Sequence, residues 1–157
     1  MTPNTGHMSR AVLLAIGFGL ASLSAGATTT ASAQAIEGVW DSRVSLHPCA
    51  DPSIVLANFR ALNQFNRHGS LVATSQVAQP PSLGKWKWLG GRRYRAEFRF
   101  QRFGAGGAFE GLTQVTRVIR LAADGKSFTS VVATELYDLT DTLFATGCGQ
   151  EEAKRVF

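Results

Sequence analysis

Polar and apolar side chains alternate strictly between Arg92 and Phe103, and this alternation most restricts how the chain can fold. Successive side chains of a β-strand point to opposite faces, so a period of two predicts a strand with one buried face. The inward positions are Tyr94, Ala96, Phe98 and Phe100, and the outward positions are Arg93, Arg95, Glu97, Arg99 and Gln101. We therefore expect a strand over residues 92–103 that covers an apolar interior.

Seven further segments read as strands separated by glycine, proline and Asx turns. The expected strands cover residues 39–46, 55–66, 70–76, 84–89, 92–103, 109–121, 126–137 and 142–157. Ser53 to Leu62 could instead form one or two helical turns, and Gln79-Pro80-Pro81-Ser82 should not be strand because proline lacks the ladder donor. A meander that does not close leaves two exposed edges. We predict an all-β fold, an eight-stranded antiparallel up-and-down barrel over residues 34–157, with a sandwich as the alternative.

Residues 1–33 have the composition of an export signal. Arg10 precedes the apolar run Ala11 to Leu23, which is too short and too rich in glycine and serine for a good membrane span. Ala31-Ser32-Ala33 then matches the small-residue pattern that signal peptidases cleave, with Ala35 as a second cleavage point. We expect a periplasmic or extracellular protein without a transmembrane segment in its mature form.

Cys49 and Cys148 are the only cysteines, and an even pair in an exported chain predicts a disulfide, with free thiols or a metal site as alternatives. If Cys49 lies opposite Cys148 in a closed barrel, Trp40 meets Phe157 and Ser42 meets Arg155, within two residues. That register places inside the barrel the side chains of Trp40, Val44, Leu46, Ala153 and Phe157, with Glu151 inside near the rim.

Gly38-Val39-Trp40 opens the first expected strand, and in this context it resembles the G-x-W signature of the lipocalin/calycin superfamily. The whole mature chain also looks like a group of small exported bacterial β-barrel proteins of unassigned function. The resemblance implies that Trp40 plugs the closed end of the barrel and that a basic residue packs across it. Arg155 is the natural match, and Arg117 or Arg120 could substitute. The C-terminal helix of full-size lipocalins has no counterpart here.

The sequence offers little to support catalysis, and we expect neither an enzyme nor a cofactor. His47-Pro48-Cys49-Ala50-Asp51 contains possible zinc ligands, but zinc sites need three or four ligands with supporting spacing. A loop histidine beside a disulfide explains this segment better, and His68 before Gly69 fits a surface turn. No catalytic residue and no metal ligand is therefore assigned.

The aromatic residues at inward positions suggest a ligand site. Small eight-stranded barrels can hold one small molecule, although many are filled by their own side chains. We predict a non-catalytic binding protein for a small hydrophobic ligand. The expected lining residues are Phe59, Phe65, Trp86, Trp88, Tyr94, Phe98, Phe100, Phe109, Phe128 and Leu136.

A basic run from Lys85 to Arg102 supports an alternative function. Removal of Arg10 with the signal leaves 15 basic residues against 11 acidic ones, so the mature chain is mildly basic. Arg93, Arg95 and Arg99 could meet an anionic envelope surface such as phospholipid, lipopolysaccharide or acidic polysaccharide, or could simply solvate an outer face. Nucleic acid is not expected for an exported protein. The Pro80-Pro81 loop, between Ala78 and Leu83, could instead act as an inhibitory loop in a protease cleft.

Overall fold

A computed structural model describes residues 33–157, so the predicted signal peptide lies outside the described residues apart from Ala33. Within this range the chain forms strands with two short 3-10 turns, η1 (Ala33–Ile36) and η2 (Arg67–Gly69). The strands are β1 (Gly38–His47), β2 (Ala57–Phe65), β3 (Ser70–Ser75), β4 (Ala78–Gly90), β5 (Arg93–Phe103), β6 (Phe109–Leu121), β7 (Ser127–Tyr137) and β8 (Leu143–Arg155).

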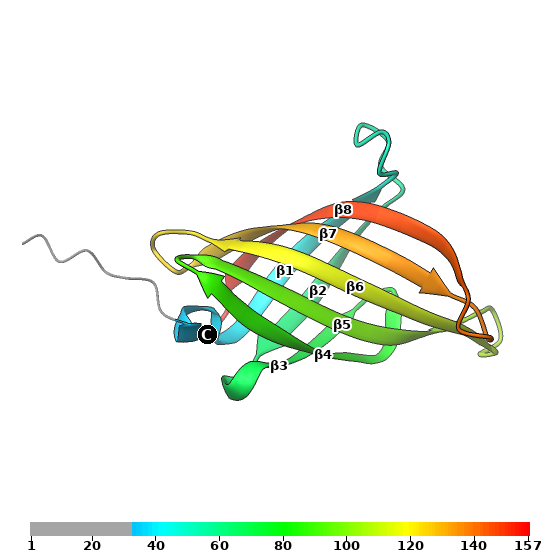
Figure 1. The fold of residues 1–157 in the computed structure, drawn as a ribbon, viewed down its shortest axis with the longest axis horizontal. Helices are drawn as coiled ribbons and strands as arrows, with labels where there is room; N and C mark the ends of the chain where they lie inside the picture. Colours follow the sequence, from blue (N-terminus) through cyan, green and yellow to red (C-terminus); the bar gives the residue numbers. More distant parts are fainter. Residues whose placement is uncertain (1–32) are drawn as a thin grey trace, which may run out of the picture.

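The strands form the predicted closed barrel (Figure 1). Each strand pairs antiparallel with the next along the chain, and β8 returns to pair with β1. Closure gives both outermost strands a hydrogen-bonding partner, which removes the exposed edges of an open meander. The eight-stranded up-and-down barrel is therefore confirmed, and the sandwich alternative is excluded.

One predicted loop is part of a strand. β4 begins at Ala78 and contains Pro80 and Pro81, which were expected to interrupt the sheet. Its ladder with β3 shifts register across this stretch, and its pairing with β5 starts only at Leu83. The two prolines thus lie in an irregular edge segment, where a missing backbone donor is tolerated. The candidate inhibitory loop from Ala78 to Leu83 is accordingly not a free loop.

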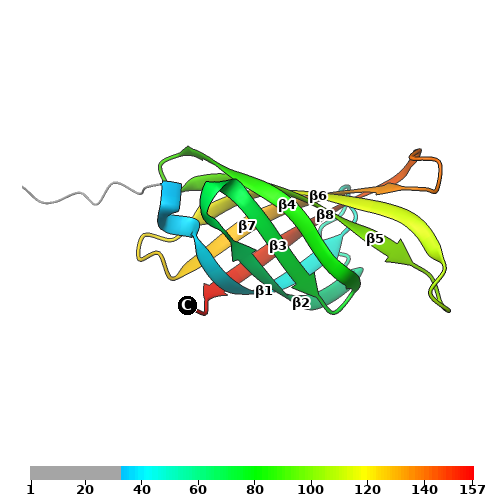
Figure 2. The ribbon, with the colours of Figure 1, turned by 90° about the horizontal axis from the view of Figure 1, so that it is seen from below.

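One end of the barrel is sealed by a core around Trp40. The indole packs against Phe128 with ring centroids 4.9 Å apart, and its Nε1 donates to the Ile36 carbonyl at 2.8 Å. The Arg155 guanidinium lies 4.2 Å from the Trp40 ring, and neither Arg117 nor Arg120 occupies this position. Arg155 also donates to the Glu37 and Ala35 carbonyls at 2.6 Å. The 3-10 turn η1 is thereby fastened across the end of the barrel (Figure 2).

Gly38 is required by this seal. Its φ is +125°, a conformation that side chains with a Cβ rarely adopt. A Cβ at this position would lie 2.7 Å from Arg155 Nη1 and 2.8 Å from the Phe157 carbonyl oxygen. Gly38 therefore lets the chain enter β1 close to the Arg155 guanidinium, where a side chain would not fit.

The predicted disulfide between Cys49 and Cys148 is present, but the register beside it differs from the expected one by two residues. Trp40 lies opposite Arg155 rather than Phe157, and Ser42 opposite Ala153 rather than Arg155. Pro48 follows the end of β1, so Cys49 reaches Cys148 from the loop and not from the ladder. An even shift keeps every inward side chain inward.

Phe157 is the exception to the predicted inner face. It follows the end of β8 and is 79% exposed, so its expected place inside the barrel is wrong. Val39 donates its backbone N–H to the Phe157 carbonyl oxygen at 3.0 Å, so the backbone there is held although the ring is not buried.

Candidate functional site

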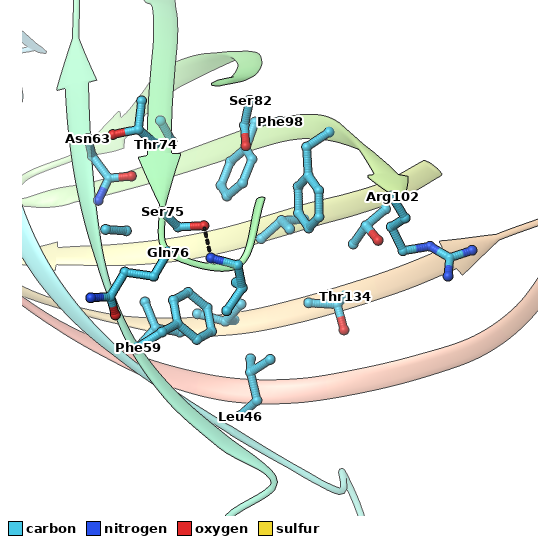
Figure 3. A pocket seen from close by; sticks show the side chains of 18 of the residues that line it. Leu46, Phe59, Asn63, Thr74, Ser75, Gln76, Ser82, Phe98, Arg102 and Thr134 are labelled. Carbon is cyan, nitrogen blue, oxygen red and sulfur yellow. Dashed lines mark hydrogen bonds between the residues drawn. The ribbon is translucent and has the colours of Figure 1, made fainter. Parts of the chain in front are cut away.

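The half of the barrel away from Trp40 contains a cavity of about 600 Å³. Its walls include Leu46 of β1, Phe59 of β2, Phe98 and Phe100 of β5, and Leu136 of β7. In Figure 3, side chains from several strands surround one common space. A volume of this size is typical of small-molecule sites.

A layer of buried polar residues separates this cavity from the sealed core. Glu151 of β8 is 1% exposed and accepts hydrogen bonds from three directions. Arg117 Nη1 of β6 donates to it at 2.7 Å, Ser130 Oγ of β7 at 2.7 Å and Asn63 Nδ2 of β2 at 3.1 Å. Asn63 Nδ2 also donates to Ser42 Oγ at 2.7 Å. In addition to β8, the strands β1, β2, β6 and β7 therefore contribute to one connected network across the barrel.

Arg117 is the least completely satisfied member of this layer. It is 3% exposed, and besides Glu151 its Nη1 donates only to Asn63 Oδ1, at 3.1 Å, among the interactions of the described chain. Its guanidinium carbon lies 4.8 Å from the Phe98 ring centroid and 5.8 Å from that of Phe65. Within residues 33–157, neither Nε nor Nη2 has a hydrogen-bond acceptor. Buried charged donors without acceptors are rare, so Arg117 is the most distinctive group on the cavity wall.

The predicted lining residues separate into three groups. The first group lines the cavity and consists of Phe59, Phe98, Phe100 and Leu136. The second group points inward but forms the sealed core, and consists of Phe65, Trp86, Tyr94 and Phe128. The third group does not line the cavity, because Trp88 is 44% exposed and Phe109 is 43% exposed. Both lie near strand ends, where an inward position no longer means burial.

Trp88 and Phe109 instead have local partners. Trp88 Nε1 donates to the Gly91 carbonyl at 2.8 Å across the β4–β5 turn, and Phe109 packs against Phe103 with centroids 5.9 Å apart. The expectation that these two residues line the interior is therefore wrong.

Sequence reasoning did not assign Arg117, Glu151 or Asn63 to the site. Arg117 occupies an inward position of β6 between the buried residues Val115 and Ile119, and a lone charge on an apolar face is a usable signal. Glu151 was expected inside near the rim, but it lies in the middle of the barrel. Its pairing with Arg117 spans 34 residues and depends on the registers of three strands.

The mouth of the cavity is formed by hairpins with apolar residues near their tips. In Figure 2 the β5–β6 and β7–β8 hairpins extend beyond the body of the barrel, at the end away from η1. Arg102 lies over the Phe144 ring at 5.1 Å and donates through Nη2 to the Tyr137 carbonyl at 2.8 Å, which joins the two hairpins. Phe103, Phe109 and Phe144 remain exposed there. The entrance thus combines exposed aromatic side chains with the half-buried Arg102 and with Glu110.

The predicted basic face lies outside the barrel. Arg93, Arg95 and Arg99 are exposed on β5, and Glu97 is bound by Arg95 Nε at 2.6 Å. That hydrogen bond, with smaller contributions from nearby cationic charges, holds the pKa of Glu97 below its ordinary value although burial opposes it. Across the strands, Lys87 lies opposite Arg95, and Arg93 opposite Arg120. Like charges are therefore placed side by side on this face.

Ionisable groups in the sealed core are shifted by burial. Burial raises the pKa of the Tyr94 phenol, and the charge of Arg155 partly opposes this shift. Burial also lowers the pKa of the Arg155 guanidinium. Both shifts follow from the burial of these two side chains in the seal around Trp40.

The two histidines of the described residues, His47 and His68, lie apart. His47 is at the end of β1, with Nδ1 3.0 Å from the Pro48 carbonyl oxygen, and His68 is exposed in η2. Within the described chain no group of three or more histidine, cysteine or acidic residues is arranged to hold a metal ion. Among the same residues, no helix has the length and apolar character needed to cross a membrane.

Protein-family models and curated proteins were compared with this chain. No protein-family model matches it, and a search of curated proteins finds no match. The resemblance to the lipocalin/calycin superfamily therefore stays a prediction carried by Gly38-Val39-Trp40 and the barrel layout.

Proposed function

We propose that this protein is an exported, non-catalytic binding protein that holds one small hydrophobic ligand in the open half of its barrel. The observation that carries the proposal is the cavity of about 600 Å³ with walls of Leu46, Phe59, Phe98 and Phe100. An interior filled by its own side chains would leave no such space. The exposed aromatic side chains at the entrance further support uptake of an apolar molecule.

Filling the cavity should prevent binding without unfolding the barrel. Thr134 lines the cavity from β7, and its neighbour Ala133 is exposed on the outer face of the same strand. We expect Thr134→Trp to weaken uptake of the neutral dye Nile red by at least about tenfold, because the indole occupies the ligand's volume. Ala133→Trp is the matched control and should bind the dye as the natural protein does.

Native mass spectrometry of protein purified from its own compartment complements this test. A bound lipid-like adduct in the natural protein, absent from Thr134→Trp, would support the proposal. Failure of the natural protein to carry an adduct or take up Nile red would contradict it, as would equal uptake by both tryptophan variants.

A second candidate function is contact with an anionic envelope surface through the basic face. The specific observation is the pairing of Lys87 with Arg95 and of Arg93 with Arg120, because like charges directly opposite each other destabilise a sheet. Lys87→Glu with Arg93→Glu would turn both into opposite-charge pairs. We expect this variant to keep or gain stability and to lose sedimentation with phosphatidylglycerol vesicles. Absence of sedimentation by the natural protein would refute this candidate.

A further inference from the structure

Arg117 presents hydrogen-bond donors that the described protein does not use. Nη1 donates to Glu151 and Asn63, whereas Nε and Nη2 find no acceptor within residues 33–157. Nε and Nη2 share one edge of the planar guanidinium, and that edge can donate two parallel hydrogen bonds. Arg117 is 3% exposed and forms part of the cavity wall, but Nε and Nη2 themselves are covered, so an acceptor in the cavity reaches them only when a neighbouring side chain such as Phe98, whose ring centroid lies 4.8 Å from the guanidinium carbon, shifts aside.

The charges around the cavity indicate what kind of acceptor fits. The charged lining residues are Arg102, Glu110, Arg117 and Glu151, so two positive and two negative groups cancel. A carboxylate ligand would add an uncompensated negative charge close to buried Glu151, and burying such a charge is costly. A neutral carbonyl oxygen has two lone pairs and can accept one converging hydrogen bond from each of the two donors without adding charge.

We propose that the ligand is an uncharged, lipid-like molecule whose carbonyl oxygen accepts hydrogen bonds from Nε and Nη2 of Arg117. This inference rests on the proposed function and specifies its ligand class. The apolar part of the ligand would extend past Phe98, which stacks on Arg117, towards Phe100 and the mouth of the cavity. The ligand therefore enters with its oxygen end first, and ketones, aldehydes and esters belong to the class.

The test compares three probes of equal chain length by displacement of Nile red at neutral pH. A methyl ketone, the corresponding alkane and the corresponding fatty acid, each of about ten carbons, suit a cavity of this size. Arg117→Lys keeps a positive charge beside Glu151 but removes the guanidinium edge. Arg60→Lys is the matched control, because Arg60 pairs with Asp41 on the outer face.

We expect the natural protein to bind the ketone more tightly than the fatty acid. Arg117→Lys should weaken ketone binding by at least about tenfold, the size expected for losing hydrogen bonds to a charged group, and should change alkane binding by no more than about twofold. Comparing variants for each probe removes differences in how the probes themselves partition from water. Arg60→Lys should behave as the natural protein.

A spectroscopic readout covers the case in which Arg117→Lys does not fold. In the natural protein the Nε–H resonance of Arg117 should shift on addition of the ketone and not on addition of the alkane. The inference is overturned if the fatty acid binds tightest, if ketone binding survives Arg117→Lys, or if that resonance does not move. If the natural protein takes up Nile red but fails these criteria, the proposed function stands and only the ligand class is refuted. If it takes up no probe, both the proposed function and the ligand class are refuted.

Discussion

The buried pair of Arg117 and Glu151 should couple strongly in stability, because each charge is compensated mainly by the other. Both residues are almost fully inaccessible, and Nη1 lies 2.7 Å from Oε1. Glu151→Gln preserves the side-chain shape and can keep contacts to Ser130 and Asn63, but leaves the guanidinium uncompensated. Removing one partner of a buried pair typically lowers the free energy of unfolding by about 3–5 kcal/mol.

Arg117→Met should have a similar effect, because the carboxylate then remains buried with only neutral donors. The double variant contains neither charge, so its loss should be much smaller than the sum of the two single losses. We expect a coupling free energy of at least about 2 kcal/mol between the two sites. Total stabilities of small domains are about 5–15 kcal/mol, so the single variants are best compared at low temperature.

The measurement is equilibrium unfolding in urea, with the disulfide intact and the transition followed by fluorescence and circular dichroism together. A double variant whose loss equals the sum of the single losses within about 0.5 kcal/mol would refute the reasoning, because independent sites behave in that way. Arg60→Met with Asp41→Asn provides the exposed control pair, for which little or no coupling is expected.

Three further predictions concern the seal, the disulfide and the β7–β8 turn. Gly38→Ala should lower the free energy of unfolding by roughly 3 kcal/mol, measured in urea, because a Cβ there is both strained and crowded by Arg155. Replacing Cys49 and Cys148 by serine should lower it by up to about 4.7 kcal/mol, and an unchanged transition would contradict this. The Asp138 carboxylate accepts hydrogen bonds from the Thr140 hydroxyl and from the amides of Thr140 and Thr142. These bonds hold the pKa of Asp138 below its ordinary value of 3.8. The turn should therefore be fully protected from amide exchange above pH 3.8 and lose protection as the pH falls through the lowered pKa, whereas Asp138→Asn should lack this acid step.

The barrel could be predicted because its determinants are local. Alternation from Tyr94 to Phe100 specifies a strand and its inner face, and short turns specify antiparallel neighbours. The disulfide then closes the meander, and the observed register, which lies within the two residues allowed by the prediction, keeps the same inner face. The place of Pro80 and Pro81 in β4 could not be predicted, because the rule that excludes proline from central strands does not apply at an irregular edge.

Depth along the barrel could not be predicted in the same way. Phe65 and Phe98 both point inward, yet one belongs to the sealed core and the other to the cavity. Their levels depend on the stagger between strands, which is a property of the whole barrel and not of any one strand. For the same reason the sequence marks Arg117 as an unusual inward charge but does not identify Glu151 as its partner.

The position of the disulfide shows how a barrel can be hollow at one end and still stay closed. At the sealed end, the seam between β1 and β8 is held by packing around Trp40 and by Arg155. At the other end a cavity replaces that packing, and there Cys49 is linked to Cys148 just beyond the last paired residue of β1. The covalent link therefore lies where side-chain packing is missing. Reduction would therefore loosen the rim around the cavity more than the packed base, so the shape of the cavity would respond to redox conditions more than the sealed end does.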